Sequence, residues 1–421
     1  MANAEYSISL GVQDAVNALM NDEGVMKGLR FLEADHERTV GDQIAICEIP
    51  APSYKEEERT KYLCAAFKKL GLKNVTVDSV GNVLGIRPGI ENGPKLVVAA
   101  HIDTVFPNET DIKVKENDGK LYGPSIADDS RGVAELLSLI RAFNETCIET
   151  LGDVVFCGDV CEEGLGNLKG SKQLFADHAD IDGFISLDGT GVASIVYAAT
   201  GSYRYKIVYR GPGGHSYTDF GASPSAVHAL GRAIAALADL EVPTEPKTTY
   251  SVGVINGGTS INVIAEEASM LVDLRSNTQE ELNKTESKFK EIVQKACDAE
   301  NSRCKSIGLS VEITLLGSRP AGSQSTDEII VQAACAGLKA IGIEPNLRLP
   351  SSTDANVPIS LGIPALAVGR GGESGQSHSV HEWFDPKDAF KGPQKDFITI
   401  LSLVGAKNIC EPLLLKKQPR Q

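Results

Sequence analysis

Short continuous apolar runs, each followed at once by polar side chains, recur in the first half of the chain and again near its end. Runs of this length are typical of strands buried on both faces, as in a parallel sheet covered by helices. Helical patterns at residues 131–143 and 168–176 lie between the runs, and this alternation predicts an α/β domain. The predicted strands are residues 96–100, 154–160, 184–187 and 365–368.

The N-terminal region is predicted to be helical. The pattern predicts helix over residues 14–37 and a second amphipathic helix over residues 54–70, after the breaker Pro50-Ala51-Pro52.

The pattern changes between about residues 197 and 315. The order of elements there is βαββαβ, which is that of a small ferredoxin-like sandwich. Strand-and-polar patterning resumes afterwards, so we predict a domain at residues 198–316 inserted into a catalytic domain of residues 1–197 and 317–421. The predicted strands of the insert are residues 202–210, 251–256, 268–274 and 310–316, and its helices are residues 223–240 and 280–301.

Potential metal ligands follow the predicted strands of the first domain. In open α/β sheets, ligands bind where the carboxyl ends of the strands leave the sheet. Histidine nitrogen and carboxylate oxygen are groups that zinc binds, and several such residues at one sheet edge are hard to explain by packing. The residues are His101, the pair Glu162 and Glu163, Asp188, a loop with His378, and Asp128-Asp129 before a helix.

Composition narrows the class of function. With 41 basic and 56 acidic residues the net charge is −15, which disfavours nucleic acid and anionic membranes as partners. The first twenty residues lack the basic and apolar regions of a secretory signal, and no apolar stretch is long enough to span a membrane. Nine scattered cysteines are typical of reduced thiols. A cytoplasmic location is therefore expected.

Six motifs in order make the chain resemble a known family over nearly its whole length. They are HIDTV (residues 101–105), GPSIADDSRG (123–132), CEEGLG (161–166), SLDG (186–189), GGHS (213–216) and SHSVHE (377–382). The family is that of the co-catalytic zinc peptidases and amidohydrolases, which include peptidase T, carboxypeptidase G, aminoacylase and acetylornithine deacetylase. The resemblance implies a mostly parallel mixed sheet flanked by helices, with an inserted α+β lid and dimerisation domain.

The resemblance also implies a centre of two divalent metal ions, most simply zinc, with cobalt and manganese as alternatives. His101 and Asp188 would hold one ion, Glu163 and His378 the other, and Asp128 would bridge them. Each ion would keep an open position, as in a catalytic site.

Two further carboxylates receive roles in the same way. Glu162 would be the general base that activates a metal-bridging water. Asp103, two residues after His101 on an extended segment, would orient that imidazole.

Several alternatives accompany this assignment. His101 and Asp103 could be a satisfied core pair, and the two glutamates a solvated turn. Asp129 could be taken for the bridge, but the motif puts the bridge at the first Asp, where the Asp-Asp peptide bond is often cis.

His381 competes with His378, and Cys157 and Cys161 could be thiolate ligands, although buried apolar cysteine is the more common role. Ser130-Arg131 departs from the family pattern, in which lysine commonly follows the Asp pair. We expect that departure to affect loop packing or substrate contact.

The insert supplies the predicted substrate contacts. By the resemblance, His215 would reach the active site of a partner subunit in a homodimer and stabilise the oxyanion. Asn262, Arg275 and Arg319 match positions that bind substrate or its carboxylate, a task that suits arginine's planar fork. A solvent-facing turn for His215 and a strand-edge salt bridge for Arg275 are the plainer interpretations.

The expected function is a metal-dependent exopeptidase that hydrolyses small peptides, a dipeptidase or a tripeptide aminopeptidase. An N-acyl amino acid deacylase or a glutamate-type carboxypeptidase is the alternative within the same chemistry. A non-catalytic ligand-binding protein on the same fold is the alternative of another class. The intact chemical residues, Glu162 among them, speak against that last alternative.

Overall fold

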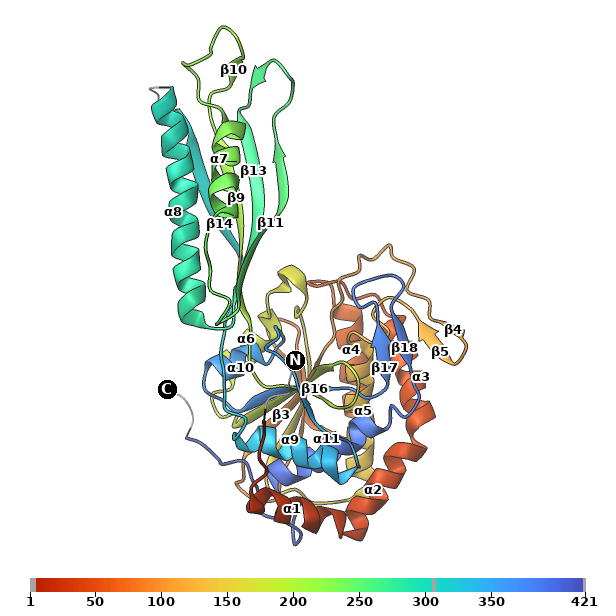
Figure 1. The fold of residues 1–421 in the computed structure, drawn as a ribbon. Coiled ribbons are helices and arrows are strands. Elements are labelled where there is room, and N and C mark those ends of the chain that lie inside the picture. The colour runs from red at the N-terminus through yellow and green to blue at the C-terminus, as the bar shows by residue number, and fades with distance from the viewer. Residues whose placement is uncertain (1–4, 305–307, 419–421) are drawn as a thin grey trace. The chain divides into compact units, whose positions relative to one another are not determined.

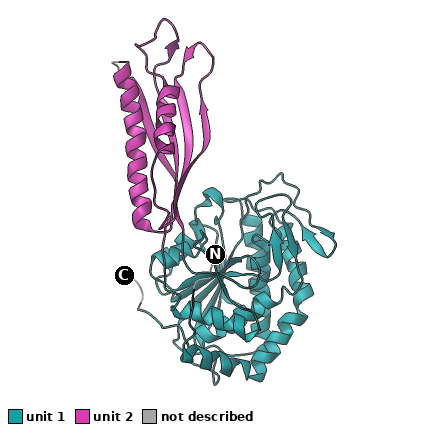
Figure 2. Ribbon diagram, viewed as in Figure 1, with its two compact units in different colours: residues 1–199, 323–421 teal, residues 200–322 magenta. Residues whose placement is uncertain are grey.

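The computed structural model describes residues 5–304 and 308–418, and the chain divides into two compact units. Unit 1 comprises residues 1–199 and 323–421, and unit 2 comprises residues 200–322 (Figure 2). The second boundary lies beyond the predicted residue 316 because the last strand of unit 2 runs to Arg319, which pairs with Ser202. Arg319 therefore belongs to unit 2 and not to the catalytic domain.

Unit 1 is built on an eight-stranded mixed sheet in the order β1-β2-β6-β3-β7-β16-β8-β15 (Figure 1). The central strands β6, β3, β7 and β16 run parallel, while β2 joins β6 and β8 joins β16 in antiparallel pairs. A mostly parallel mixed sheet was predicted and is confirmed. The strands are β1 Lys73–Val77, β2 Val83–Arg87, β3 Lys95–His101, β6 Asp153–Asp159, β7 Gly183–Gly189, β8 Ser194–Val196, β15 Asn346–Leu347 and β16 Ala365–Gly369.

Helices cover both faces of this sheet. Alternate residues of β3 show it, because Val98 packs in the larger hydrophobic cluster of the unit and Val97 packs in a separate one. Both side chains are fully buried, as expected for a strand covered on both faces. The helices that follow the N-terminal region are α5 Ser130–Thr146, α6 Lys169–Asp177, α9 Ile329–Ala340, α10 Asn356–Ser360 and α11 Lys391–Val404.

The N-terminal helical region is more broken than predicted. In place of one helix over residues 14–37 there are three helices, α1 Leu10–Met20, α2 Glu23–Ala34 and α3 His36–Cys47. The Asp22 side chain explains the first break, since it accepts a hydrogen bond from Val25 N at 3.0 Å and so caps a new helix. The next helix, α4 Glu57–Lys69, lies within the predicted residues 54–70.

A small antiparallel sheet of unit 1 was not predicted. Its order is β17-β18-β5-β4, and it joins Lys120–Tyr122 (β5) to Trp383–Asp385 (β18). Strands of three residues carry too little periodicity to be found in a sequence. The sheet brings the segment after His378 alongside the segment before Asp128. Its outer strands are β4 Lys115–Asn117 and β17 Glu373–Gly375.

Unit 2 has the predicted βαββαβ order. Its antiparallel sheet runs β11-β13-β9-β14, and its two helices pack on that sheet around one hydrophobic cluster (Figure 1). A short two-stranded ribbon joins β10 to β12. The elements are β9 Gly201–Arg210, β10 Gly214–His215, α7 Ala226–Ala238, β11 Thr248–Gly257, β12 Val263–Ile264, β13 Glu267–Ser276, α8 Gln279–Arg303 and β14 Ser310–Arg319.

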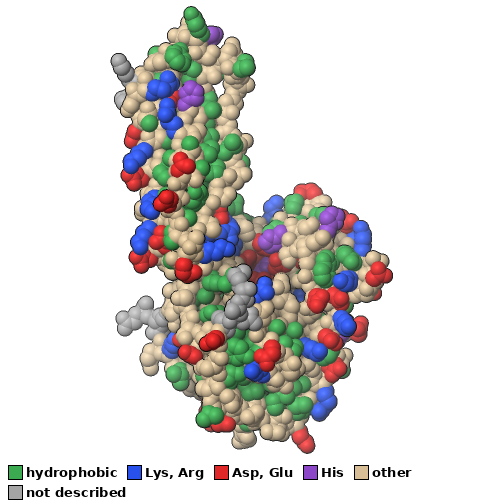
Figure 3. Space-filling view, in the orientation of Figure 1, with side chains coloured by type: hydrophobic (Ala, Val, Ile, Leu, Met, Phe, Trp, Pro, Cys, Tyr) green, Lys and Arg blue, Asp and Glu red, His purple; other side chains and the backbone are tan. Residues whose placement is uncertain are grey.

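Charge is mixed over the surface. On the visible face of each unit, lysine and arginine side chains are interspersed with acidic ones (Figure 3). Within residues 5–304 and 308–418, no helix combines the length and the apolar character needed to cross a membrane.

Candidate metal centre

The carboxyl ends of the central strands bring the predicted ligands of unit 1 together. His101 is the last residue of β3, Asp188 lies at the end of β7, and Glu163 follows β6. Asp128 comes just before α5. Ligand atoms of His101, Asp128 and Glu163 all lie within 4.8 Å of one another, so these three could hold a metal ion.

Asp128 stands between two histidines. His101 Nε2 lies 3.3 Å from Asp128 Oδ1, and His378 Nε2 lies 3.3 Å from Asp128 Oδ2. Each carboxylate oxygen thus faces a different imidazole, which is the arrangement that a bridging ligand requires. The peptide bond between Asp128 and Asp129 is cis, as the resemblance implies.

The other two predicted ligands complete the cluster. His378 Nε2 lies 2.9 Å from Glu163 Oε1, and Asp188 Oδ1 lies 3.9 Å from His101 Nε2. His381 is exposed, and its backbone N–H donates to Ser379 Oγ. The structure therefore brings His378 into the cluster, and among the described residues His381 has no such contact with it.

The electrostatics of the cluster favour bound positive charge. Hydrogen bonds to Asp128 and Glu163 raise the pKa of His378 to about 10. Burial opposes a charged His101, but its hydrogen bonds to Asp103 and Asp128 raise its pKa well above the usual value. Burial and the neighbouring charge of Asp128 raise the pKa of Asp188 well above its usual range. Protons are thus retained where a divalent cation would replace them.

Asp103 connects His101 to the two glutamates. Its Oδ1 lies 3.5 Å from His101 Nδ1 and accepts a hydrogen bond from Glu162 N at 2.9 Å. Its Oδ2 accepts from Glu163 N at 3.0 Å and from Ser53 Oγ at 2.6 Å. The backbone O of Asp103 lies 3.1 Å from His101 Nδ1, so Asp103 fixes the imidazole, while its fully buried carboxylate fixes the backbone that carries both glutamates.

Glu162 is buried beside the cluster. It lies next to Glu163 in the chain, and both backbone N–H groups are held by the one Asp103 carboxylate.

Arg370 is a residue of the site that the sequence did not reveal. It follows β16, is 3% exposed, and pairs through Nη1 with Asp129 Oδ1. The same nitrogen lies 3.4 Å from Asp128 Oδ1 and 3.7 Å from Asp188 Oδ1. Its only sequence signal was a charged residue inside the glycine-rich stretch GRGGESG.

Glu382 is a second residue that sequence reasoning missed. Its fully buried carboxylate accepts hydrogen bonds from Ala127 N and Asp128 N, both at 2.8 Å, and from Ser125 N at 3.3 Å. Burial, together with the charge of Asp128, raises its pKa to about 7. It thereby holds the backbone that presents Asp128.

The remaining alternatives in unit 1 have other surroundings. Cys157 and Cys161 are buried, and burial raises the pKa of both thiols, which disfavours thiolate ligands. Arg131 is buried, and its guanidinium donates to Arg370 O at 3.1 Å and to Ala389 O at 2.8 Å. The departure from the family pattern therefore serves loop packing.

The predicted substrate contacts all lie in unit 2. His215 is exposed on β10, and Ser216 N donates to Asn262 O at 3.0 Å, so these two positions are neighbours. His215 Nδ1 accepts from Tyr217 N and Thr218 N at 3.2 and 3.4 Å, which leaves the proton on Nε2. Arg275 pairs with Asp273 at 2.6 Å, and Arg319 is buried on β14.

The residues fit a metal centre by their chemistry. Two imidazoles and three carboxylates converge at the edge of one sheet, and both imidazoles attract protons strongly. Nitrogen and oxygen donors of this kind suit zinc and other first-row divalent ions.

Comparisons with known proteins show the family of the chain. The model of peptidase family M20/M25/M40 matches residues 97–394. The uncharacterised protein YqjE of Bacillus subtilis is 26% identical over 83% of this chain and 93% of its own length. Succinyl-diaminopimelate desuccinylase of Corynebacterium glutamicum is 26% identical over 80% and 90%.

Solved structures share the fold. Aminopeptidase PepT from Bacillus cereus superimposes with a TM-score of 0.72 at 24% identity, covering 87% of this chain and 98% of that chain. A dipeptidase from Saccharomyces cerevisiae gives a TM-score of 0.69 at 16% identity, covering 89% and 98%. Fold, site and family model together define a hydrolase of the peptidase class. The chain belongs to peptidase family M20/M25/M40.

Proposed function

We propose that this protein is a metal-dependent exopeptidase that hydrolyses an amide bond of small peptides, as a dipeptidase or a tripeptide aminopeptidase. The cluster of His101, Asp128 and Glu163, which Asp188 and His378 adjoin, supports it most directly, with Glu162 beside them. PepT and the yeast dipeptidase, which share the fold, are peptidases by name.

Different residues of the site would bind metal, transfer protons and position other side chains. The five predicted ligands would hold the divalent ions, whose chemistry would be Lewis-acid polarisation of the scissile carbonyl and acidification of a water. Glu162 takes the proton of the attacking water and later gives it to the leaving amine. Asp103 orients His101 and the backbone of Glu162 and Glu163 through its hydrogen bonds.

A deacylase is the second candidate, because a relative of nearly full length is a succinyl-diaminopimelate desuccinylase. A glutamate-type carboxypeptidase is a further candidate, because Carboxypeptidase G2 of a Pseudomonas strain is a relative. It is 24% identical over 72% of this chain and 74% of its own length. The deciding experiment is an assay of the zinc-, cobalt- or manganese-supplied protein on free di- and tripeptides beside N-acyl amino acids and C-terminal glutamate peptides. Binding without turnover of every substrate would contradict an enzymatic role and leave a ligand-binding protein.

The purified protein is expected to bind two divalent ions per chain. His378→Ala should lose about one of them, since it removes a ligand from one ion only. His381→Ala is the matched control and should keep both, because its side chain lies outside the cluster. Metal analysis after dialysis measures the stoichiometry. Loss of metal from the control with retention in His378→Ala would reverse the assignment.

We further propose that the protein works as a homodimer in which His215 reaches the metal centre of the partner subunit. The Nε2 proton of His215, fixed by the two backbone donors on Nδ1, suits it to donate to an oxyanion. Substrate contacts by Asn262, Arg275 and Arg319 and a cytoplasmic location stay predictions from the sequence. Arg275 also forms an ion pair with Asp273, which agrees with the plainer interpretation of a strand-edge salt bridge.

Mixing two inactive variants tests this arrangement. His215→Ala and Glu162→Gln should each be nearly inactive alone, because each lacks one group of every site. Refolded together, half of the dimers are mixed and one of their two sites is intact, so about a quarter of wild-type activity should return. Refolding each variant alone provides the control. No recovery in the mixture would place both residues in the site of one chain.

A further inference from the structure

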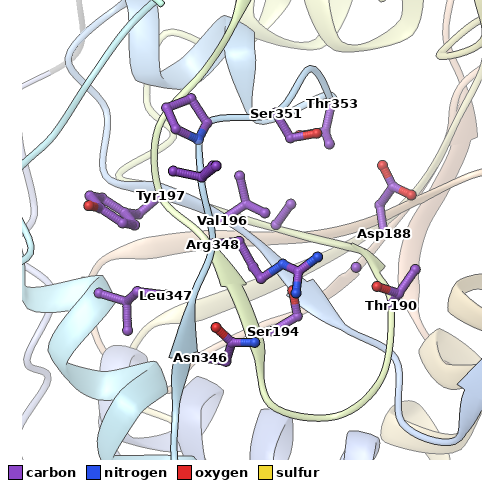
Figure 4. Close-up of a pocket in the computed structure, with 14 residues that line it drawn as sticks. Asp188, Thr190, Ser194, Val196, Tyr197, Asn346, Leu347, Arg348, Ser351 and Thr353 are labelled. Carbon is purple, nitrogen blue, oxygen red and sulfur yellow. The ribbon is translucent and has the colours of Figure 1, made fainter. Parts of the chain in front are cut away.

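A pocket of unit 1 adjoins Asp188 and is not part of the ligand cluster. Its volume is about 640 Å³, within the range of small-molecule sites. One side is formed by residues 188–190 and by β8 with Tyr197, and the other by residues 346–351 and Thr353 (Figure 4). The pocket is therefore continuous with the candidate metal centre at Asp188.

Arg348 gives this pocket its charge. Of the described residues that line it, Asp188 and Arg348 are the only charged ones, and Asp188 is a predicted metal ligand. Arg348 is exposed, and within the part of the chain that the structure describes its guanidinium makes no hydrogen bond or ion pair that would neutralise it. In Figure 4 the guanidinium extends toward the side of the pocket where Asp188 and Thr190 lie.

The backbone fixes the direction of Arg348. Strands β15 and β8 pair in parallel, with Asn346 opposite Ser194. Just after β15, Arg348 N donates to Ile195 O at 2.8 Å. Leu347 and Ile195 are buried in the large hydrophobic cluster of the unit. Asn346 and Arg348 flank Leu347 on this paired segment, and both line the pocket.

We infer that this pocket is the substrate's specificity pocket and that Arg348 binds a carboxylate of the substrate. The inference rests on the proposed hydrolytic function and narrows its substrate class. A guanidinium recognises a carboxylate through two parallel hydrogen bonds, and Ser194, Asn346 and Thr190 add neutral polar groups around it. Because Asp188 both lines the pocket and is a predicted metal ligand, an amide bond at the metal centre would lie at the edge of this pocket.

Three pairs of substrates distinguish the sources of that carboxylate. Gly-Glu against Gly-Gln tests an acidic side chain, N-succinyl-leucine against N-butyryl-leucine tests a dicarboxylic acyl group, and Gly-Leu against its C-terminal amide tests the chain end. In the wild-type protein, kcat/KM for the acid should exceed that for its neutral partner at least tenfold in one pair. Arg348→Met should lower that ratio about tenfold to a hundredfold, the range for a hydrogen bond to a charged group.

Matched variants separate this role from a general disturbance. Arg348→Lys should keep part of the preference for the acid, since it keeps the positive charge and loses the two parallel hydrogen bonds of the guanidinium. Arg30→Met, at an exposed arginine of α2, should leave the ratio unchanged. A preference that survives Arg348→Met in every pair, or the absence of any preference in the wild type, would overturn the inference while hydrolysis itself stood.

A binding measurement that needs no turnover distinguishes failure of the hydrolytic function from failure of the carboxylate pocket. Glutarate and pentanoate differ by one carboxylate, and calorimetry on the metal-supplied protein compares their affinities. Wild type should bind glutarate at least ten times more tightly than pentanoate, and Arg348→Met should remove the difference. If no substrate is hydrolysed but this pattern holds, the hydrolytic function fails and the anion pocket stands. Equal effects of the substitution on both ligands would contradict the pocket.

Discussion

Replacing Glu162 by Gln is expected to lower kcat at least a hundredfold while the metal content stays at the wild-type level. The substitution keeps the size of the side chain and removes its ability to take a proton, and general acid-base catalysis contributes about 10²–10⁴ to a rate. Glu162 is buried beside the cluster, and its backbone N–H donates to Asp103, a contact that a side-chain substitution does not remove. The fold of the site should therefore survive.

Glu163→Gln is the matched contrast, one residue along the same buried segment. Its carboxylate lies 2.9 Å from His378 Nε2 and is a predicted metal ligand. This variant should lose metal, and part of its activity should return when the metal concentration is raised. The measurement is kcat together with bound metal per chain for each variant. A fully metallated Glu162→Gln protein with near-normal turnover would exclude the proton-transfer role.

The sequence predicted the site because its ligands follow a local rule. His101 and Asp188 come directly after an apolar run and Glu163 shortly after one, and parallel strands bring such ends to the same edge of a sheet. No knowledge of strand order was needed for that step. The ferredoxin-like order of unit 2 was likewise predicted, because its strands and helices are long and regular.

Residues that support the site obey no local rule. Glu382 binds the backbone of Asp128 across 254 positions of the chain, and Arg370 pairs with Asp129 across 241. Both contacts depend on how loops after different strands meet. The short strands β5 and β18 pair, and this pairing brings Glu382 to Ala127 and Asp128. No pattern in the sequence predicts it. The pocket at Arg348 is of the same kind, since it arises from the pairing of two short strands.

Arg370→Met is expected to destabilise unit 1 by about 3–5 kcal/mol, the cost of leaving a buried charge without its partner. The Asp129 carboxylate is fully buried, and it ties three segments together. It accepts from Gly132 N at 3.0 Å at the start of α5, from His101 N at 3.2 Å at the end of β3, and from Arg370 after β16. Burial, opposed in part by Arg370, already raises the pKa of Asp129 to about 6.

Urea unfolding of the chelator-treated proteins measures the effect, so that lost metal does not contribute. Arg30→Met is the control for loss of an arginine from an exposed helix and should change the unfolding free energy by no more than about 0.5 kcal/mol. Adding Asp129→Asn to Arg370→Met should recover part of the loss, since the uncompensated charge is removed. Arg370 also donates through Nε to Gly189 O at 3.0 Å, so recovery should be incomplete. Additive effects of the two substitutions would show that Arg370 stabilises the unit by some contact other than its pairing with Asp129.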